Sequence, residues 1–219
     1  MIPLRDANPS RTIPFITYLL ILINFIVFFF ELSIGKYQND LFLHLGLIPS
    51  VWIADVKLFH AHSFLPLFTS MFLHGGWIHL LGNMLFLFIF GDNVEDKFGH
   101  GRYFVFYIVA GLAAAITQIY FNAASEAPMI GASGAIAGVM GAYVLMFPKA
   151  RITTLIFIII FIKIIELPAY VFLGLWFLMQ IFSGMMALGI GSDAGGVAWW
   201  AHIGGFAMGI VAVPFLKRR

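Results

Sequence analysis

The sequence lacks cysteine and contains few charged residues, and both shortages limit what the protein can be. Without cysteine, disulfide bonds and thiolate chemistry are excluded, and the redox compartment cannot be inferred. Charged residues make up 10% of the 219 residues, whereas 62% are hydrophobic and the mean hydropathy is +0.99. A soluble domain could not bury so much apolar surface, so the composition predicts a polytopic membrane protein. The small net charge of +2 does not suggest a nucleic-acid partner.

Internal repeats and low-complexity segments are also absent, whereas apolar runs of spanning length recur along the chain. A helix needs about 20 mostly apolar residues to cross a bilayer. The sequence therefore predicts a single all-α membrane domain with six transmembrane helices, at about residues 12–31, 75–91, 103–121, 131–147, 168–190 and 197–216. No small-residue cleavage site follows the first run, so we expect a retained span rather than a signal peptide.

Two segments between these runs are harder to assign. Residues 32–74 mix charged side chains with Trp52 and Phe64, which is typical of a structured loop resting partly at the membrane interface. Residues 152–165 are intensely apolar, but Lys163 interrupts them too early for a span. We predict an interfacial or re-entrant segment there. The alternative, a seventh span, would place the last run in the opposite orientation.

Lys and Arg predict the orientation of the bundle. With six spans and a cytoplasmic N-terminus, ten of the 12 basic residues are cytoplasmic. These are Arg5, Arg11, Lys97, Arg102, Lys149, Arg151, Lys163, Lys217, Arg218 and Arg219. Only Lys36 and Lys57 are then outside. The bias predicts a multi-pass protein of the cell membrane with both termini in the cytoplasm.

A serine and a histidine lie in two runs that have matching faces of small residues. Ser133 precedes Gly134 and Gly138, and His202 precedes Gly205 and Gly209 at the same helical spacing. Small faces of this kind let two membrane helices approach closely. Ser133 and His202 would then meet near the outer end of the bundle. A serine beside a neutral imidazole is an activated nucleophile, with the histidine as general base.

Further polar groups lie at the same predicted depth. His79 and Asn83 are four residues apart and share a helix face, and the backbone N–H of Ser133 opens a helix. These three donors could bind the oxyanion of a tetrahedral intermediate. Alternatively, His79 and Asn83 form interhelical hydrogen bonds that hold the bundle together, which is the role we expect for His74. No acidic partner for the histidine is apparent, since Asp193 lies in the loop before the last run.

Three motifs in this order resemble the signatures of rhomboid intramembrane serine proteases. They are LHGGWIHLLGN at residues 73–83, GASG at 131–134 and AHIGG at 201–205. The resemblance implies a Ser133–His202 dyad, an oxyanion site of His79, Asn83 and the Ser133 amide, and support from Gly131 and the other motif glycines. It also implies no metal or cofactor, and substrates that are transmembrane proteins cut near the outer membrane boundary. Ala137 stands where relatives often place an aromatic ring against the base, and the first loop lacks a Trp-Arg pair.

Two other functions remain open from the sequence. One is a rhomboid-like protein that binds membrane clients without cutting them, although such proteins usually lack the serine or the histidine. The other is a transporter that uses His79, Asn83 and His202 as a proton path. Transporters more often contain repeats and charges at the midplane, and neither is visible in this sequence.

Overall fold

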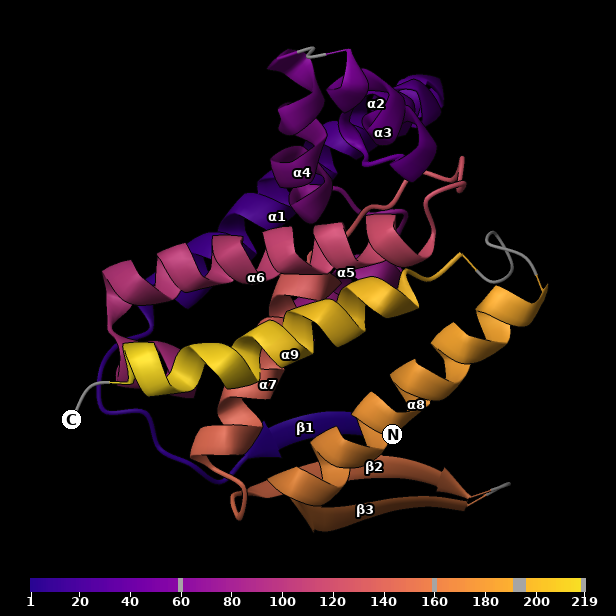
Figure 1. Ribbon diagram of the computed structural model, residues 1–219. Helices are drawn as coiled ribbons and strands as arrows, with labels where there is room; N and C mark the ends of the chain where they lie inside the picture. The colour runs from indigo at the N-terminus through magenta and orange to yellow at the C-terminus, as the bar shows by residue number, and fades with distance from the viewer. Residues whose placement is uncertain (59–60, 159–160, 191–195, 218–219) are drawn as a thin grey trace.

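The protein is a bundle of membrane-length helices, seen here in a computed structural model that describes residues 1–58, 61–158, 161–190 and 196–217 (Figure 1). Within the described residues, five helices are long and apolar enough to cross a membrane, which confirms a helical polytopic membrane protein. In chain order the long elements are α1 (Phe15–Ser33), α5 (Trp77–Phe98), α6 (His100–Phe121), α7 (Ser133–Met146), α8 (Ala169–Ile190) and α9 (Trp199–Leu216). One of these helices lies in each of the six predicted runs, and the largest difference is at α5, which ends seven residues after residue 91.

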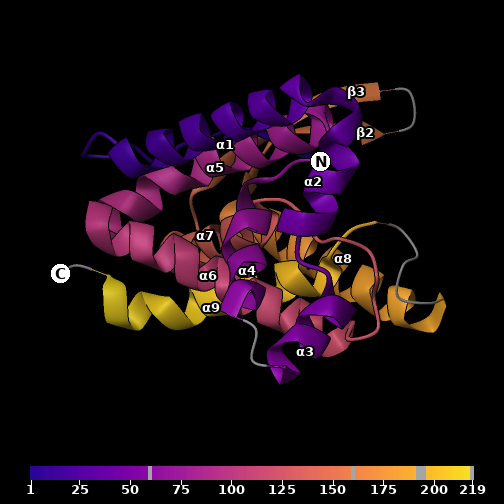
Figure 2. The same cartoon turned by 90° about the horizontal axis from the view of Figure 1, so that it is seen from above.

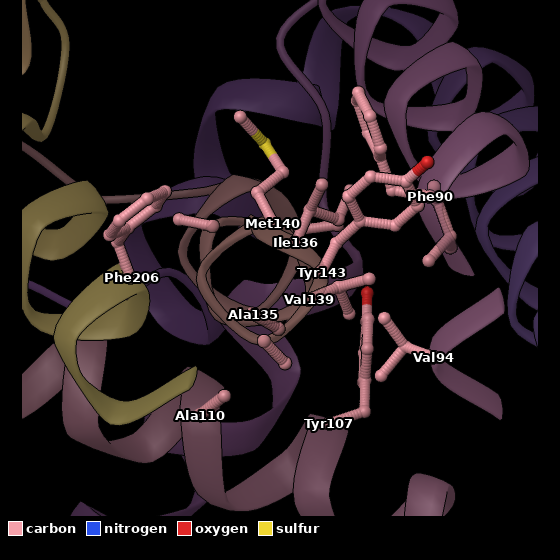
Figure 3. Close-up of a cluster of buried hydrophobic side chains, with 14 of the residues drawn as sticks. Phe90, Val94, Tyr107, Ala110, Ala135, Ile136, Val139, Met140, Tyr143 and Phe206 are labelled. Atoms are coloured by element: carbon pink, nitrogen blue, oxygen red, sulfur yellow. The ribbon is translucent and has the colours of Figure 1, made fainter. Parts of the chain in front are cut away.

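Helix α7 is the shortest of the six and the most deeply buried. Its 14 residues reach about 21 Å, less than the roughly 30 Å of a bilayer's hydrocarbon core. Every residue from Gly134 to Tyr143 is buried. Figure 3 shows the reason: side chains of α5, α6 and α9, among them Phe90, Tyr107 and Phe206, surround α7 in the hydrophobic core. The count of six spans stays a prediction, because α7 by itself is shorter than the hydrocarbon core of a bilayer.

Hydrogen bonds show which helix ends lie together. At one end, Tyr143 near the end of α7 donates to Asp6 at 2.6 Å, and the Thr12 hydroxyl before α1 donates to Asp96 near the end of α5 at 3.0 Å. At the other end, the loop before α5 joins the end of α1, because the His74 N–H donates to Glu31 at 3.1 Å. Helices α1, α5, α6 and α7 therefore alternate in direction between two ends of the molecule.

Glu95 fixes the start of α1 from outside that helix. The chain enters α1 through Pro14, and no side chain of its own caps it. The Glu95 carboxylate of α5 instead accepts from the N–H groups of Ile16 and Thr17 at 2.9 and 2.8 Å and from the Thr17 hydroxyl at 2.7 Å. These contacts satisfy donors that every helix N-terminus leaves free. They join α1 to α5, which lie side by side in Figure 2.

The segment at residues 152–165, predicted to be interfacial or re-entrant, forms a β-hairpin of β2 (Arg151–Ile158) and β3 (Phe161–Pro168). Its strands are an addition to the all-α bundle that the sequence predicted. Strand β1 (Ile2–Asp6) pairs with β2, so a three-stranded antiparallel sheet accompanies the helices. Short apolar runs do not reveal whether they are helix or strand, and here the pairing partner lies at the distant N-terminus.

The hairpin leaves the direction of the chain unchanged. The N–H of Ala169, which opens α8, donates to Ala150 at 2.8 Å, just before β2. Helix α8 thus begins at the end of the molecule where α7 finishes. The hairpin is therefore not a seventh helical span, and α9 returns to run in the same direction as α7.

The loop between α1 and α5 is structured, as predicted. It forms the short helices η1 (Gly35–Tyr37), α2 (Gln38–Leu45), α3 (Pro49–Lys57), η2 (Ala61–Phe64), α4 (Leu65–Thr69) and η3 (Ser70–Phe72). The labelled helices of this loop gather at the top of Figure 1. Backbone hydrogen bonds between Leu47 and Met129, at 3.1 and 2.8 Å, join this loop to the segment that leads into α7.

Candidate active site

A serine and a histidine from two neighbouring helices form the centre of the site. Ser133 is the first residue of α7, and His202 lies in the first turn and a half of α9. The Ser133 Oγ and His202 Nε2 atoms are 2.8 Å apart, a hydrogen-bonding distance. His202 is only 9% exposed. A serine hydroxyl at this distance from an imidazole nitrogen can act as a nucleophile, with the histidine accepting its proton.

Glycines allow this approach, because the backbones of α7 and α9 are in direct contact. A side chain on Gly205 would overlap the carbonyl oxygen of Gly134, and one on Gly209 would overlap that of Gly138. A Cβ on Gly138 would in turn lie 2.5 Å from Ala110 of α6. Larger residues at these positions would force the helices apart and separate the serine from the histidine.

Hydrogen-bond donors from α5 face the same place. The Nδ1 atom of His79 accepts from the Gly75 N–H at 3.4 Å, so a neutral His79 carries its proton on Nε2. A Cβ at Gly131 would lie 2.6 Å from that Nε2 and 3.6 Å from Asn83 Nδ2. Gly131 also has a φ of 121°, which L side chains rarely adopt. Glycine at position 131 therefore leaves room for the side-chain donors of His79 and Asn83, two residues before Ser133.

Asn83 is buried, and no described residue bonds to its amide nitrogen Nδ2. Buried donors are usually paired, so an unpaired one needs an explanation. A cavity of about 380 Å³ supplies it, since Asn83, His79, Ser133 and His202 all contribute to its walls. The rest of the lining is mostly apolar, with Met71, Ile78, Phe86, Met140 and Trp176 among its residues. The N–H of Ser133, at the first position of α7, has no acceptor within its own helix and adds a third donor beside the serine hydroxyl.

His74 lies outside this cavity and supports it. The side chain is completely buried, its Nδ1 donates to the Phe72 carbonyl at 3.2 Å, and its ring packs edge-on against His79 with centroids 5.0 Å apart. Burial lowers the pKa of His74 to about 4, and the nearby His79 acts in the same direction. His74 is therefore neutral and holds His79 in place by packing.

Helix α8 supplies two residues that the sequence analysis missed. Gln180 Oε1 lies 2.7 Å from His202 Nδ1, and the Trp176 ring lies 5.7 Å from the imidazole, tilted by 38°. Trp176 thus places an aromatic ring near His202, whereas Ala137 of α7 is fully buried and lies beside Gly205 of α9. The available signal was Gln180 itself, an isolated amide in an otherwise apolar span. Asp193 lies outside the described residues.

The remaining clusters of polar residues do not suggest a metal centre. Within the described ranges, no group of three or more His, Asp or Glu side chains is placed to hold a metal ion.

Comparison with known proteins agrees with these motifs. A family model described as "Rhomboid domain" matches residues 61–219, well over half of the chain. The chain belongs to the rhomboid family. This rhomboid is 34% identical over 130 residues to "Rhomboid protease GluP" of Bacillus subtilis (strain 168), covering 59% of the chain and 24% of that protein.

Two further relatives are eukaryotic. The rhomboid chain is 39% identical over 83 residues to "RHOMBOID-like protein 1" of Arabidopsis thaliana, covering 38% of the chain and 21% of the relative. It is 28% identical over 153 residues to "Rhomboid protein 1, mitochondrial" of Saccharomyces cerevisiae (strain ATCC 204508 / S288c), covering 68% and 41%. The chain thus matches less than half the length of each of these relatives.

Proposed function

We propose that this rhomboid is an intramembrane serine endopeptidase that cleaves transmembrane proteins near the outer membrane boundary. The observation that carries the proposal is the 2.8 Å contact between Ser133 Oγ and His202 Nε2, made at the wall of a cavity that also presents unpaired donors. The similarity to "Rhomboid protease GluP" supports the same function.

The proposed reaction proceeds in two halves. Ser133 Oγ attacks the substrate carbonyl carbon while its proton passes to His202 Nε2. The carbonyl oxygen becomes an oxyanion that His79 Nε2, Asn83 Nδ2 and the Ser133 N–H stabilise by hydrogen bonds. His202 then returns the proton to the leaving nitrogen, and the C–N bond breaks. Water then attacks the acyl-Ser133 ester while His202 accepts its proton. The ester bond to Ser133 breaks, His202 returns the proton to Ser133 Oγ, and the new carboxyl group is released.

The position of the site favours substrates that unwind easily. Within an intact helix a peptide carbonyl is already hydrogen-bonded and shielded, so attack needs an opened segment. Helix α7, at about 21 Å, is shorter than the roughly 30 Å hydrocarbon core, which supports a position of Ser133 below the outer boundary of that core. We therefore expect cleavage near the outer end of a substrate helix that contains small or helix-breaking residues. Lengthening the stable part of that helix with leucine should slow cleavage, and an unchanged rate would contradict this selection.

A serine-directed fluorophosphonate probe tests the proposal on the purified full-length protein. We expect labelling of the wild type, none of Ser133→Ala, and strongly reduced labelling of His202→Ala. The exposed Ser33, whose hydroxyl donates to Phe30 at 2.7 Å, provides the matched control: Ser33→Ala should label like the wild type. Cleavage of a transmembrane substrate should be lost in both site variants, and the double variant should be no worse than either single one.

The alternatives give different results in the same experiments. A client-binding rhomboid would retain substrate without labelling or cleavage, and a proton-coupled transporter would show neither labelling nor cleavage. Either outcome would remove the protease proposal.

The proposal includes a cell-membrane location with both termini cytoplasmic, supported by the distribution of basic residues. Single cysteines introduced at positions 36 and 193 should then react from outside, and those at 97, 150, 165 and 218 should not.

A further inference from the structure

The buried amide of Gln180 has a place in the site that the proposed two-residue mechanism does not use. Gln180 lies in the second half of α8 and is 4% exposed, although its neighbours Leu178, Met179 and Phe182 are 61%, 49% and 69% exposed. Burying an amide in a membrane bundle is costly unless both its ends are hydrogen-bonded. In Gln180 both ends are paired.

The two contacts fix which way the amide points. One end of Gln180 lies 3.1 Å from the carbonyl oxygen of Trp176, one helical turn earlier. A carbonyl oxygen only accepts, so the group facing it is the Nε2 amino group. The other end, Oε1, then faces His202 Nδ1 at 2.7 Å. An amide turned the other way would place two oxygens against each other, so chemistry assigns this orientation.

The orientation of the amide decides where the histidine carries its proton. Oε1 of Gln180 only accepts, so the imidazole nitrogen opposite it, Nδ1 of His202, is the donor. In a neutral imidazole the other nitrogen, Nε2, then has a free lone pair. That lone pair faces the Ser133 hydroxyl at 2.8 Å. Every hydrogen bond in the series therefore runs in one direction, from Ser133 through His202 and Gln180 to the Trp176 carbonyl.

We propose that Gln180 is the positioning residue of the general base, holding His202 in the tautomer and ring orientation that accept the serine proton. This inference rests on the proposed serine-protease function. Gln180 takes the place that a buried carboxylate holds in a three-residue serine site, but it is uncharged. It therefore orients the base without adding a negative charge to the apolar interior, where an unpaired carboxylate is expensive.

A spectroscopic measurement tests the tautomer directly. In full-length protein labelled with ¹⁵N at histidine, protonated and unprotonated ring nitrogens resonate in separate ranges, and the His202 signals are those missing from His202→Ala. We expect the wild type to carry its proton on Nδ1 with Nε2 unprotonated. In Gln180→Leu, which keeps the size but removes the acceptor, we expect a mixture of tautomers. A wild type protonated on Nε2 would overturn the proposal, whatever the variants do.

Kinetics with matched variants test the consequence. Gln180→Leu should lower kcat by about ten- to a hundredfold, the range found when a metal-binding histidine loses the partner that orients it, with KM within about twofold. Neutral glutamate in Gln180→Glu repeats both bonds, its O–H donating to the Trp176 carbonyl and its C=O accepting from Nδ1–H, so most activity should return. Met179→Leu, on the exposed side of the same helix, should behave like the wild type. Unchanged kcat in Gln180→Leu would overturn the proposal.

These outcomes are separable from failure of the protease proposal. If the wild type neither labels at Ser133 nor cleaves substrate, the proposed function fails, and the ¹⁵N spectrum still decides whether Gln180 sets the tautomer. If Gln180→Leu does not fold, as judged by its melting profile, the wild-type and Gln180→Glu spectra carry the test.

Discussion

The Asn83→Ala variant distinguishes a catalytic donor from a structural one, because Asn83 Nδ2 makes no hydrogen bond to any described residue. Its Nδ2 group is buried without a partner among the described residues and lies at the cavity wall near Gly131. A buried unpaired donor costs about 1–3 kcal/mol of stability. Removing it should therefore leave the Tm unchanged or slightly raised. A structural strut would instead lower the Tm when its hydrogen bonds were lost.

The effect on catalysis should be large. Loss of one oxyanion donor typically costs about 10²–10³ in kcat, equivalent to roughly 3–4 kcal/mol. His79 Nε2 and the Ser133 N–H remain as donors, so we expect a decrease near the lower limit, about a hundredfold. The donor acts only when negative charge forms on the oxygen, so KM should change little.

Asn93 provides the matched control on the same helix. It is also a buried asparagine of α5, but its Nδ2 donates to the Asn8 carbonyl at 3.3 Å and to Asp92 at 2.8 Å. Asn93→Ala should lose about 1–2 kcal/mol, which lowers the Tm by about 2–8 °C, while kcat per folded molecule is retained. The assay is kcat, KM and Tm on the same detergent preparations. A clear fall in the Tm of Asn83→Ala with normal kcat per folded molecule would refute the oxyanion assignment.

Other substitutions test the supporting structure. Gly209→Leu should separate α7 from α9 and abolish cleavage, with fluorophosphonate labelling as the measure; normal labelling would show that close backbone contact is not needed. Glu95→Ala should lose about 2–4 kcal/mol by freeing the N–H and hydroxyl donors at Thr17, with kcat per folded molecule unchanged, as thermal melting and kinetics can measure. The folded-state pKa of His74 is about 4, below its unfolded value of about 6.5. Between these two pH values the unfolded chain binds more protons than the folded protein. The Tm should therefore fall as the pH falls from about 6.5 to about 4. This fall should be smaller in His74→Phe but unchanged in the exposed control His44→Asn; equal pH dependence in both variants would contradict the linkage.

The sequence determined the class of the protein and predicted the residues of its candidate site. Apolar runs alone identify membrane helices, because a bilayer requires a minimum length of apolar residues and little else. The glycine spacing that follows Ser133 and His202 predicts two faces able to touch, because helical periodicity places residues three and four apart on one side. The three motifs also predicted the rhomboid family, which the match of the family model to residues 61–219 shows.

The sheet was not predictable in the same way. Residues 151–158 form a strand only because residues 161–168 fold back on them and Ile2–Asp6 arrives from the other end of the chain. A strand needs partners for its backbone groups, whereas a helix satisfies its own. The apolar run between α7 and α8 therefore showed its hydrophobicity in the sequence but not its conformation.

The hydrogen bond between Gln180 and His202 was decided by tertiary structure alone. A single glutamine in an apolar helix can pair with any neighbour that the helix faces, and its sequence position does not state which. Only the packing of α8 against α9 turns Gln180 toward His202, and only the Trp176 carbonyl sets which end of the amide faces the imidazole. The sequence thus supplied Ser133, His202 and Gln180. How these side chains are oriented was decided by the packing of helices that are distant in the chain, and that packing is not written in local sequence.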